Sequence, residues 1–268
     1  MTAKYNALNE QHIQQSIQEY SKQSLNTPYL GKVSCFESID STNTWLLENG
    51  KHHDICLSET QTAGRGRQNN PGISPNSGNI YLSFCSYFND NIKHRSLLGL
   101  VAGIATSEAL QESGLTGQGI KWPNDIFWND KKLGGILIQT AENYEKFIIG
   151  IGLNISLPDE SLSEISQAAT SLEEAMLRQT VDREQVVIHL IQHLLSHVDI
   201  FATLPFHAFL KSWQRWDILH GRTVSFQYQG KEVSGIVEGI DNHGRIGVLL
   251  NSGIEYFSAV DIKLNKPK

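Results

Sequence analysis

Two arginines stand alone in a neutral, glycine-rich stretch of the chain. Residues 61–88 contain only two charged side chains, Arg65 and Arg67, and both lie in the short motif GRGR. Guanidinium groups bind phosphate or carboxylate oxygens through paired hydrogen bonds, and Gly64 and Gly66 let the backbone approach a ligand closely. The pattern indicates a loop that binds an anion, although GRGR taken alone is more often a solvated turn.

A second candidate site is the motif GIKWPND. Pro123 removes a backbone donor and restrains Trp122, so the segment should leave a strand sharply and project Lys121, Asn124 and Asp125 from the sheet edge. An ammonium group there could neutralise a phosphate or a reacting carboxylate, and a carboxylate could position Mg²⁺ or a lysine amine. A strand-end turn with a surface ion pair explains the motif equally well.

Three weaker signals add polar side chains. The motif IDSTN places Ser41, Thr42 and Asn43 at a helix N-terminus, which binds polar or anionic groups, although helix capping explains part of it. Lys132 lies beside two glycines at the start of an apolar strand, and Asn154 ends the motif GIGLN with a side chain suited to reading a base edge. Each of these signals is weak alone.

Three histidines recur on one predicted helix. His189, His193 and His197 are spaced i, i+4 and i+8, which lets imidazoles share a metal ion. They flank the apolar stripe of the helix on its solvent side, and no carboxylate is interleaved at that spacing. We therefore interpret them as a solvated helix face rather than a metal site.

These residues need a framework that brings them together. From residue 32 to residue 154 short β-type runs dominate, interrupted by helical patterns at 42–48 and 97–105; the runs are VSCF, ICLS, IYLSFCSYF, IFW, GGILIQ and FIIGIGLNI. A second helical block has one helix after Asp182 and another after Pro205. This order predicts an α+β fold with a mixed sheet and helices packed on one face.

The hydrophobic pattern changes to a period of two after Gly221. Short strands joined by tight turns predict a small C-terminal β-barrel. We therefore expect three parts: an N-terminal helix and tail at 1–30, a main domain at 31–218 and the barrel at 219–268.

The composition of the whole chain excludes several classes of protein. A net charge of −6 and a pI near 5.9 argue against a protein that mainly coats nucleic acid or anionic membranes. The most apolar window, residues 97–110, is shorter than the roughly 20 residues that span a bilayer, so no transmembrane helix is expected. Cys35, Cys56 and Cys85 show no CxxC spacing and fall in apolar runs, which indicates buried thiols in a reducing cytoplasm.

The order of these motifs is specific. IDSTN, QTAGRGR, KWPND, KKLGGIL and IIGIGLNI, followed by a small barrel, resemble the biotin protein ligases over about residues 36–262. The resemblance implies a class II synthetase-like catalytic domain and an SH3-like barrel. It also implies that biotin and Mg-ATP form biotinyl-5′-AMP, and that a lysine of the biotin carboxyl carrier protein of acetyl-CoA carboxylase then accepts the biotinyl group. Family members often dimerise through their sheets, so a homodimer is allowed.

The resemblance also implies roles for individual residues. The biotin site would consist of Ser41, Thr42, Asn43, Gln61, Gly64, Arg65, Gly66, Arg67 and Lys121, with Arg65, Gly66 and Arg67 in the loop that closes over the adenylate. Of these, Lys121, Arg65 and Arg67 would act in catalysis. The nucleotide and metal side would consist of Asn124, Asp125, Lys132 and Asn154, with Mg²⁺ carried by ATP rather than by a dedicated protein site.

The chain departs from the family in two places. The usual family pattern is GRGRxxRxW, but this chain has Asn70 and Gly72 in place of the third arginine and the aromatic residue. This difference puts the closing half of the loop in question. About 35 residues precede the catalytic pattern, fewer than a winged-helix DNA-binding domain takes. We therefore expect a monofunctional ligase without specific DNA binding. The alternatives are a lipoate or octanoate ligase of the same fold, or a nucleic-acid-binding regulator.

Overall fold

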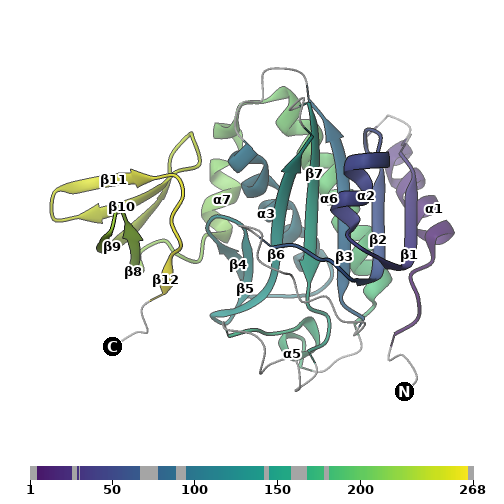
Figure 1. The fold of residues 1–268 in the computed structure, drawn as a ribbon, viewed down its shortest axis with the longest axis horizontal. Helices are drawn as coiled ribbons and strands as arrows, with labels where there is room; N and C mark the ends of the chain where they lie inside the picture. The colour runs from purple at the N-terminus through teal and green to yellow at the C-terminus, as the bar shows by residue number, and fades with distance from the viewer. Residues whose placement is uncertain are drawn as a thin grey trace.

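The computed structural model describes residues 5–25, 29, 31–66, 78–88, 95–141, 145–157, 168–177 and 181–264. Within them the chain forms two β-sheets and a layer of helices (Figure 1). The strands are β1 (Val33–Ile39), β2 (Ile55–Gln61), β3 (Ile80–Tyr87), β4 (Gln118–Lys121), β5 (Asp125–Trp128), β6 (Lys131–Thr140), β7 (Lys146–Leu153), β8 (Thr223–Tyr228), β9 (Lys231–Ile240), β10 (Ile246–Leu250), β11 (Gly253–Phe257) and β12 (Lys263–Leu264). The helical segments are α1 (Glu10–Tyr20), η1 (Ser21–Leu25), α2 (Thr42–Asn49), α3 (Arg95–Glu112), α5 (Leu172–Ala175), α6 (Arg183–Thr203), η3 (Phe206–Phe209) and α7 (Leu210–Trp216).

The larger sheet is mixed, as predicted. Its 7 strands lie in the order β1-β2-β3-β7-β6-β5-β4, with β1 and β2 parallel and the other neighbours antiparallel. The central strands β3 and β7 are buried along nearly their whole length. Continuous burial of this kind requires cover on both faces of the sheet, which explains why their sequences are apolar runs rather than alternating patterns.

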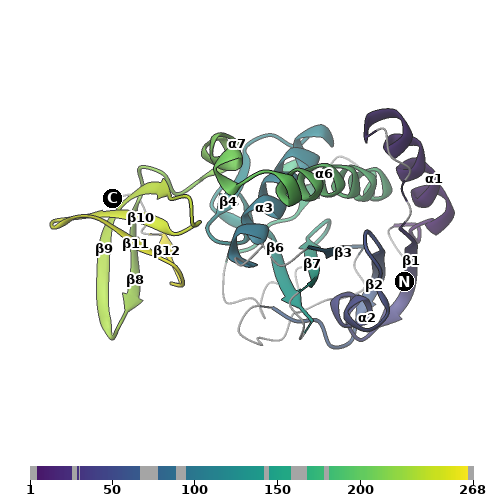
Figure 2. The ribbon, with the colours of Figure 1, turned by 90° about the horizontal axis from the view of Figure 1, so that it is seen from above.

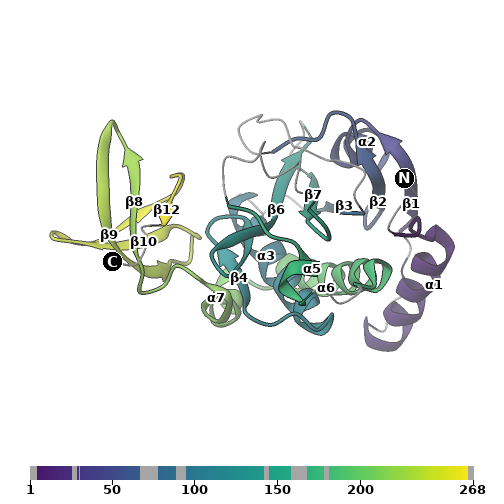
Figure 3. The same ribbon diagram turned by 90° about the horizontal axis from the view of Figure 1, so that it is seen from below.

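Helices lie on both faces of this sheet. Figures 2 and 3 show α3 and α6 along one face and α2 on the other. The helix α3 contacts β4, β5 and β6, and α6 contacts β3 and α3, whereas α2 contacts β2, β3 and β7. The predicted helix layer is thus formed by α3 and α6, and the short helix α2 is positioned on the opposite face, where Ser41 caps it.

The helix α6 is long and apolar enough, by length and composition only, to cross a membrane. Half of its apolar window is buried inside the protein. Leu190, Ile191 and Leu194 are fully buried in the main core, and α6 packs against α3. These contacts are those of a core helix, because its apolar face is already covered by the sheet and by α3.

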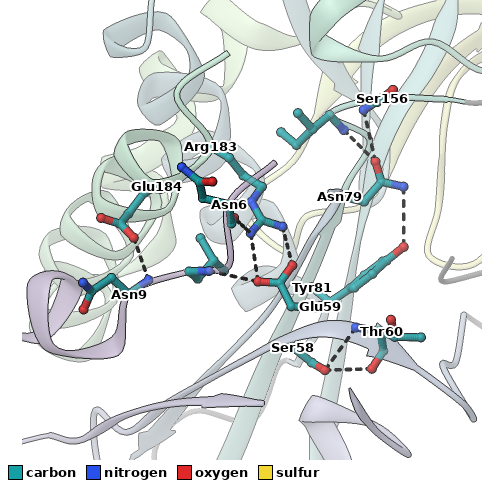
Figure 4. Close-up of polar contacts among 12 residues, drawn as sticks. Asn6, Asn9, Ser58, Glu59, Thr60, Asn79, Tyr81, Ser156, Arg183 and Glu184 are labelled. Carbon is teal, nitrogen blue, oxygen red and sulfur yellow. Dashed lines mark hydrogen bonds and ion pairs between the residues drawn. The ribbon is translucent and has the colours of Figure 1, made fainter. Parts of the chain in front are cut away.

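The N-terminal segment is tied to α6 and β2 through a buried ion pair (Figure 4). Arg183 is 4% exposed, and its guanidinium lies 2.6 Å from Oε2 of Glu59 and donates to the carbonyl oxygen of Asn6 at 2.7 Å. Ile13 and Ile17 of α1 are fully buried. The expected N-terminal helix is therefore an integral part of the main core.

The C-terminal sheet lies beyond the β4 edge, where α7 leads into it (Figure 1). Its 5 strands are antiparallel, in the order β11-β10-β9-β8-β12. Among the described residues no pairing joins β11 to β12, so the predicted barrel is an open sheet. Trp122 Nε1 donates to the carbonyl oxygen of Gly244 at 2.9 Å, which links β4 of the main sheet to the β9–β10 turn.

The three cysteines are free thiols, as expected. Cys56 and Cys85 are buried and Cys35 is half-buried. Burial raises the pKa of Cys35 and of Cys85 to about 12 and raises the pKa of Cys56 as well. Because thiolate is the reactive form, these side chains are inert packing residues.

Candidate functional site

One row of paired residues crosses the whole larger sheet. Paired residues on neighbouring strands point to the same face. The row consists of Lys121 (β4), Asp125 (β5), Gly135 (β6), Gly152 (β7), Tyr81 (β3), Ser58 (β2) and Phe36 (β1). Gly150, two residues before Gly152, faces Asn43 of α2. The row therefore lies on the face that carries α2, opposite to α3 and α6.

Two glycines form the middle of this row. A Cβ atom added at Gly152 would meet no described atom within 4 Å, which means open space above the strand. A Cβ atom at Gly135 would lie 3.3 Å from Oδ1 of Asp125 and 3.4 Å from Nζ of Lys132. A ligand can therefore lie directly on the backbone at Gly152, with charged groups to one side and α2 to the other.

The N-terminus of α2 is anchored to the end of β2. Ser41 caps the helix by accepting a hydrogen bond from Thr44 N. The backbone N and the Oγ1 of Thr42 both donate to Oε1 of Gln61, at 2.9 and 3.1 Å. Ser41 and Thr42 are each 3% exposed. The predicted residues of this motif thus lie together with Gln61.

A buried polar network continues from α2 onto the sheet. The amide of Asn43 donates to Oε1 of Gln139 at 2.7 Å and accepts from Oγ of Ser83 at 2.5 Å. Ser83 is fully buried on β3 and lies two residues from Tyr81 of the central row. The network fixes the N-terminus of α2 over β3, β6 and β7, next to the open space at Gly152.

Lys121 occupies the β4 end of the row. Burial lowers the pKa of its ammonium group, Asp125 and Asp261 oppose this change, and Lys132 reinforces it. Its Nζ lies 5.4 Å from the centre of the Phe127 ring. Nζ makes no hydrogen bond to any residue that the structure describes, so the ammonium is available for an anionic ligand.

Asp125 and Lys132 form an ion pair beside Lys121. Nζ of Lys132 lies 2.7 Å from Oδ1 of Asp125, and both side chains are mostly buried. The backbone of Lys132 also pairs with the segment 168–170. The ion pair places one carboxylate and two ammonium groups at this end of the row.

The two predicted asparagines hold main-chain segments in place. Nδ2 of Asn124 donates to the carbonyl oxygen of Ile136 at 2.6 Å. Nδ2 of Asn154 donates to the carbonyl oxygen of Thr170 at 3.1 Å. Both side chains are half-buried, and these bonds fix their orientation at the edges of the site.

The arginine loop is described only in its first half. Ala63 N donates to the carbonyl oxygen of Asp40 at 2.8 Å, which brings the loop to the N-terminus of α2. Gly64 is buried, whereas Arg65 is exposed and Gly66 is half-buried. Arg67, Asn70 and Gly72 lie outside the described residues.

Sequence reasoning did not select several residues of this arrangement. They are Ser58, Tyr81, Ser83, Gly135, Gln139 and Gly152. Tyr81 and Ser83 lie two residues apart in the apolar run IYLSFCSYF, so both point to the same face of the strand. Polar groups at this spacing are a signal that this face carries a polar site. Strand pairing is not visible in the sequence, so the row itself could not be predicted.

The interpretation of the three histidines as a solvated face is wrong. The side chains of His189, His193 and His197 are only 12%, 23% and 13% exposed. They contact Glu108 and Glu112 of α3. The carboxylates come from a neighbouring helix, so the spacing along α6 alone could not reveal them.

Comparisons with known proteins find relatives over most of the chain. Residues 35–156 match the Biotin/lipoate A/B protein ligase family, and residues 219–264 match the Biotin protein ligase C terminal domain. The Bifunctional ligase/repressor BirA of Escherichia coli is 32% identical over 222 residues, which are 81% of this chain and 68% of that protein. The biotin–acetyl-CoA-carboxylase ligase of Mycobacterium tuberculosis is 27% identical over 257 residues, 90% of this chain and 94% of that protein.

A solved structure of the same architecture contains both small molecules implied by the motifs. The biotin protein ligase from Aquifex aeolicus, in complex with biotin and ATP, superposes with a TM-score of 0.77 at 26% sequence identity. The superposition covers 87% of this chain and 99% of that one. The predicted mixed sheet with helices and a small β-domain at the C-terminus is confirmed, although the described residues of that domain form an open sheet rather than the expected barrel.

Proposed function

The chain belongs to the biotin protein ligase family, and from this premise we propose that it joins biotin to a protein lysine in two steps. In the first step, a carboxylate oxygen of biotin attacks the α-phosphorus of ATP, which forms biotinyl-5′-AMP and releases pyrophosphate. In the second step, the amine of the acceptor lysine attacks the acyl carbon, which forms an amide and releases AMP. The biotin ligases among the relatives favour this reaction over lipoate or octanoate ligation and over nucleic-acid-binding regulation.

The open space at Gly152 is the observation that carries the assignment of the site. It lies between the buried N-terminus of α2 and the ammonium group of Lys121. An uncharged ring system suits the backbone floor, and a carboxylate tail suits the ammonium. Biotin would contact the residues Ser41, Thr42, Asn43, Gln61, Gly64, Arg65, Gly66, Arg67 and Lys121.

Lys121 would act on the first step by charge rather than as a nucleophile. Negative charge is shared between the biotin carboxylate and the α-phosphate as the new bond forms. A half-buried ammonium with no competing hydrogen bond to a described residue stabilises that charge more than a solvated one would. Arg65 and Arg67 would bind the adenylate from the loop.

The nucleotide would lie toward β5, β6 and the segment after β7. Asn124, Asp125, Lys132 and Asn154 face this side in the proposal. Asp125 is the one carboxylate of the central row, and Mg²⁺ commonly takes one or two carboxylates together with substrate phosphates. These donors fit an ion that arrives with ATP, and the ion would neutralise the phosphate oxygens and the departing pyrophosphate.

The acceptor would be the biotin carboxyl carrier protein of acetyl-CoA carboxylase. The reaction would take place in the cytoplasm, where free thiols such as those of Cys35, Cys56 and Cys85 persist. The parts at 1–30, 31–218 and 219–268 remain our proposed division of the chain. A homodimer and the lack of specific DNA binding also remain predictions.

One assay tests the function directly. The protein is incubated with ATP, Mg²⁺, labelled biotin and a biotin carrier domain, and lipoate is added as a competitor. We expect label on the carrier, dependence on ATP and no competition by lipoate. Transfer of labelled lipoate in preference to biotin would contradict the assignment, as would label on the carrier without ATP.

A further inference from the structure

The helix layer contains a compact cluster of ligand-type side chains that the proposed reaction does not use. Glu108 lies on α3, and His193 and His197 lie one turn apart on α6. One ligand atom from each residue lies within 4.8 Å of the other two. Oε2 of Glu108 is 3.5 Å from Nδ1 of His193 and 3.1 Å from Nε2 of His197. Ligands about 2.0–2.1 Å from a tetrahedral zinc ion are separated by similar distances.

The hydrogen bond of His197 determines which of its nitrogens faces the cluster. Nδ1 of His197 lies 2.9 Å from the carbonyl oxygen of His193. A carbonyl only accepts, so Nδ1 carries the hydrogen and Nε2 of the neutral ring presents a lone pair to Glu108. A lone pair and a carboxylate oxygen at 3.1 Å repel each other, so either a proton or a metal ion must lie between them.

The second histidine repeats the arrangement with its other nitrogen. Nε2 of His193 lies 2.8 Å from Oε2 of Glu112, which fixes the hydrogen on Nε2. Nδ1 of the neutral ring then presents its lone pair to Glu108. Histidines that bind metals typically donate their second N–H to a carboxylate or a backbone carbonyl. Glu112 and the backbone at His193 supply these two partners.

The third predicted histidine lies outside the cluster. Nδ1 of His189 is 2.9 Å from Oγ of Ser113, and its Nε2 is 2.7 Å from Nε2 of Gln185. Both ring nitrogens are therefore engaged, which makes His189 a matched control on the same helix.

We propose that Glu108, His193 and His197 bind one divalent ion of the zinc type, with water as the remaining ligand. The three side chains are 13–24% exposed, so the site is shielded but reachable from solvent. Because α3 and α6 lie on the face of the sheet opposite to Lys121, the ion ties the two helices together and takes no part in the biotin reaction. Imidazole and carboxylate donors suit zinc better than magnesium.

The test uses the full chain after removal of metals by a chelator. Isothermal titration with Zn²⁺ should show one site, and Co²⁺ should give the visible absorption bands of a four-coordinate nitrogen and oxygen site. His197→Gln and Glu108→Gln should weaken Zn²⁺ binding by at least about 10-fold, and Glu112→Gln by roughly 10-fold through the second N–H of His193. His189→Gln should change the affinity by less than about two-fold.

The outcomes separate a built site from adventitious binding by the 10 histidines of the chain. If the unmodified protein binds neither Zn²⁺ nor Co²⁺ more tightly than roughly 100 µM, the proposal is wrong, because a three-ligand site should exceed that affinity. Equal binding by His197→Gln, Glu108→Gln and the unmodified protein would also overturn it. None of these measurements uses biotin, so their result is independent of the proposed reaction.

Discussion

At the scale of single residues, Lys121 should carry the largest electrostatic contribution to adenylate formation. Replacing Lys121 with alanine removes a half-buried ammonium whose Nζ has no hydrogen bond to a described residue. We expect a loss of about 3 kcal/mol of transition-state stabilisation, which is on the order of 100-fold in rate. Pyrophosphate release measures the first step, and circular dichroism should show an unchanged fold.

A matched variant controls for the loss of a positive charge. Lys131→Ala removes a surface lysine of β6 that pairs with Glu174 of α5 at 2.6 Å. Its rate of pyrophosphate release should stay within about two-fold of the unmodified protein, since exposed ion pairs contribute little. If Lys121→Ala and Lys131→Ala behave alike, Lys121 has no part in the first step.

Two glycines of the KKLGGIL and GIGLN motifs should respond differently to an added side chain. Gly152→Val places carbon atoms in open space, so the free energy of unfolding should change by less than about 1 kcal/mol while the KM for biotin rises. In Gly134→Ala the new Cβ would lie 2.4 Å from the carbonyl oxygen of Gly152, so this variant should lose stability. Denaturant unfolding and biotin titration measure both. An unchanged KM in Gly152→Val would show that biotin lies elsewhere.

At the scale of elements, the sequence predicted most helices and strands because their signals are local. The helix expected at 42–48, the helix after Asp182 and the helix after Pro205 are all confirmed, and Ser41 caps the first of them. Residues close together in sequence, such as Ser41 to Asn43, were also selected correctly as a group that lies together. Ser83 and Gln139 were missed because their side-chain contacts join Asn43 of α2 to strands that lie 40 and 96 residues away in the sequence.

The contact between α3 and α6 should make stability depend on pH in the metal-free protein. Burial alone would raise the pKa of Glu108, but His193 and His197 hold it at about 2, below its ordinary value of 4.5. Burial alone would lower the pKa of His193, but the hydrogen bonds that its ring donates to Glu108 and Glu112 raise it above 6.5. The pKa of His189 is lowered, mainly by burial, so its shift has the opposite sign to that of His193.

The signs define a pH window for this contribution. A carboxylate with a depressed pKa stabilises the fold above pH 4.5 and loses that effect as pH falls toward 2. A histidine with a raised pKa stabilises the fold below pH 6.5 and loses that effect as pH rises through its folded pKa. The difference in unfolding free energy between the unmodified protein and His193→Gln should therefore be largest between about pH 4.5 and pH 6.5. A difference that grows above pH 8 would contradict this ion-pair network.

At the scale of the whole molecule, the C-terminal sheet contacts the proposed site through the motif KWPND. Trp122 follows Lys121 directly and donates to the carbonyl oxygen of Gly244 in the C-terminal sheet. Asp261, which follows β11, opposes the lowering of the pKa of Lys121 by burial. The hydrophobic patterns predicted the mixed sheet and a small C-terminal barrel, but this link was not predicted because nothing in the sequence pairs an indole with a turn 122 residues away.

Removing this link should loosen the C-terminal sheet and disturb the site together. Trp122→Phe keeps an aromatic side chain at this position, which is 3% exposed, but the smaller ring has no N–H, so the carbonyl of Gly244 loses this donor. We expect a loss of about 1–3 kcal/mol in unfolding free energy and faster hydrogen exchange in the turn that contains Gly244. Because the sheet also carries Asp261, the rate of pyrophosphate release should fall.

Trp128→Phe is the matched control. It deletes an exposed hydrogen bond from the indole N–H to the carbonyl oxygen of Thr116, and it should leave both hydrogen exchange in the turn of Gly244 and the rate of pyrophosphate release unchanged. If Trp122→Phe alters stability but leaves both exchange at the turn and the rate as they were, the two sheets are joined without being coupled.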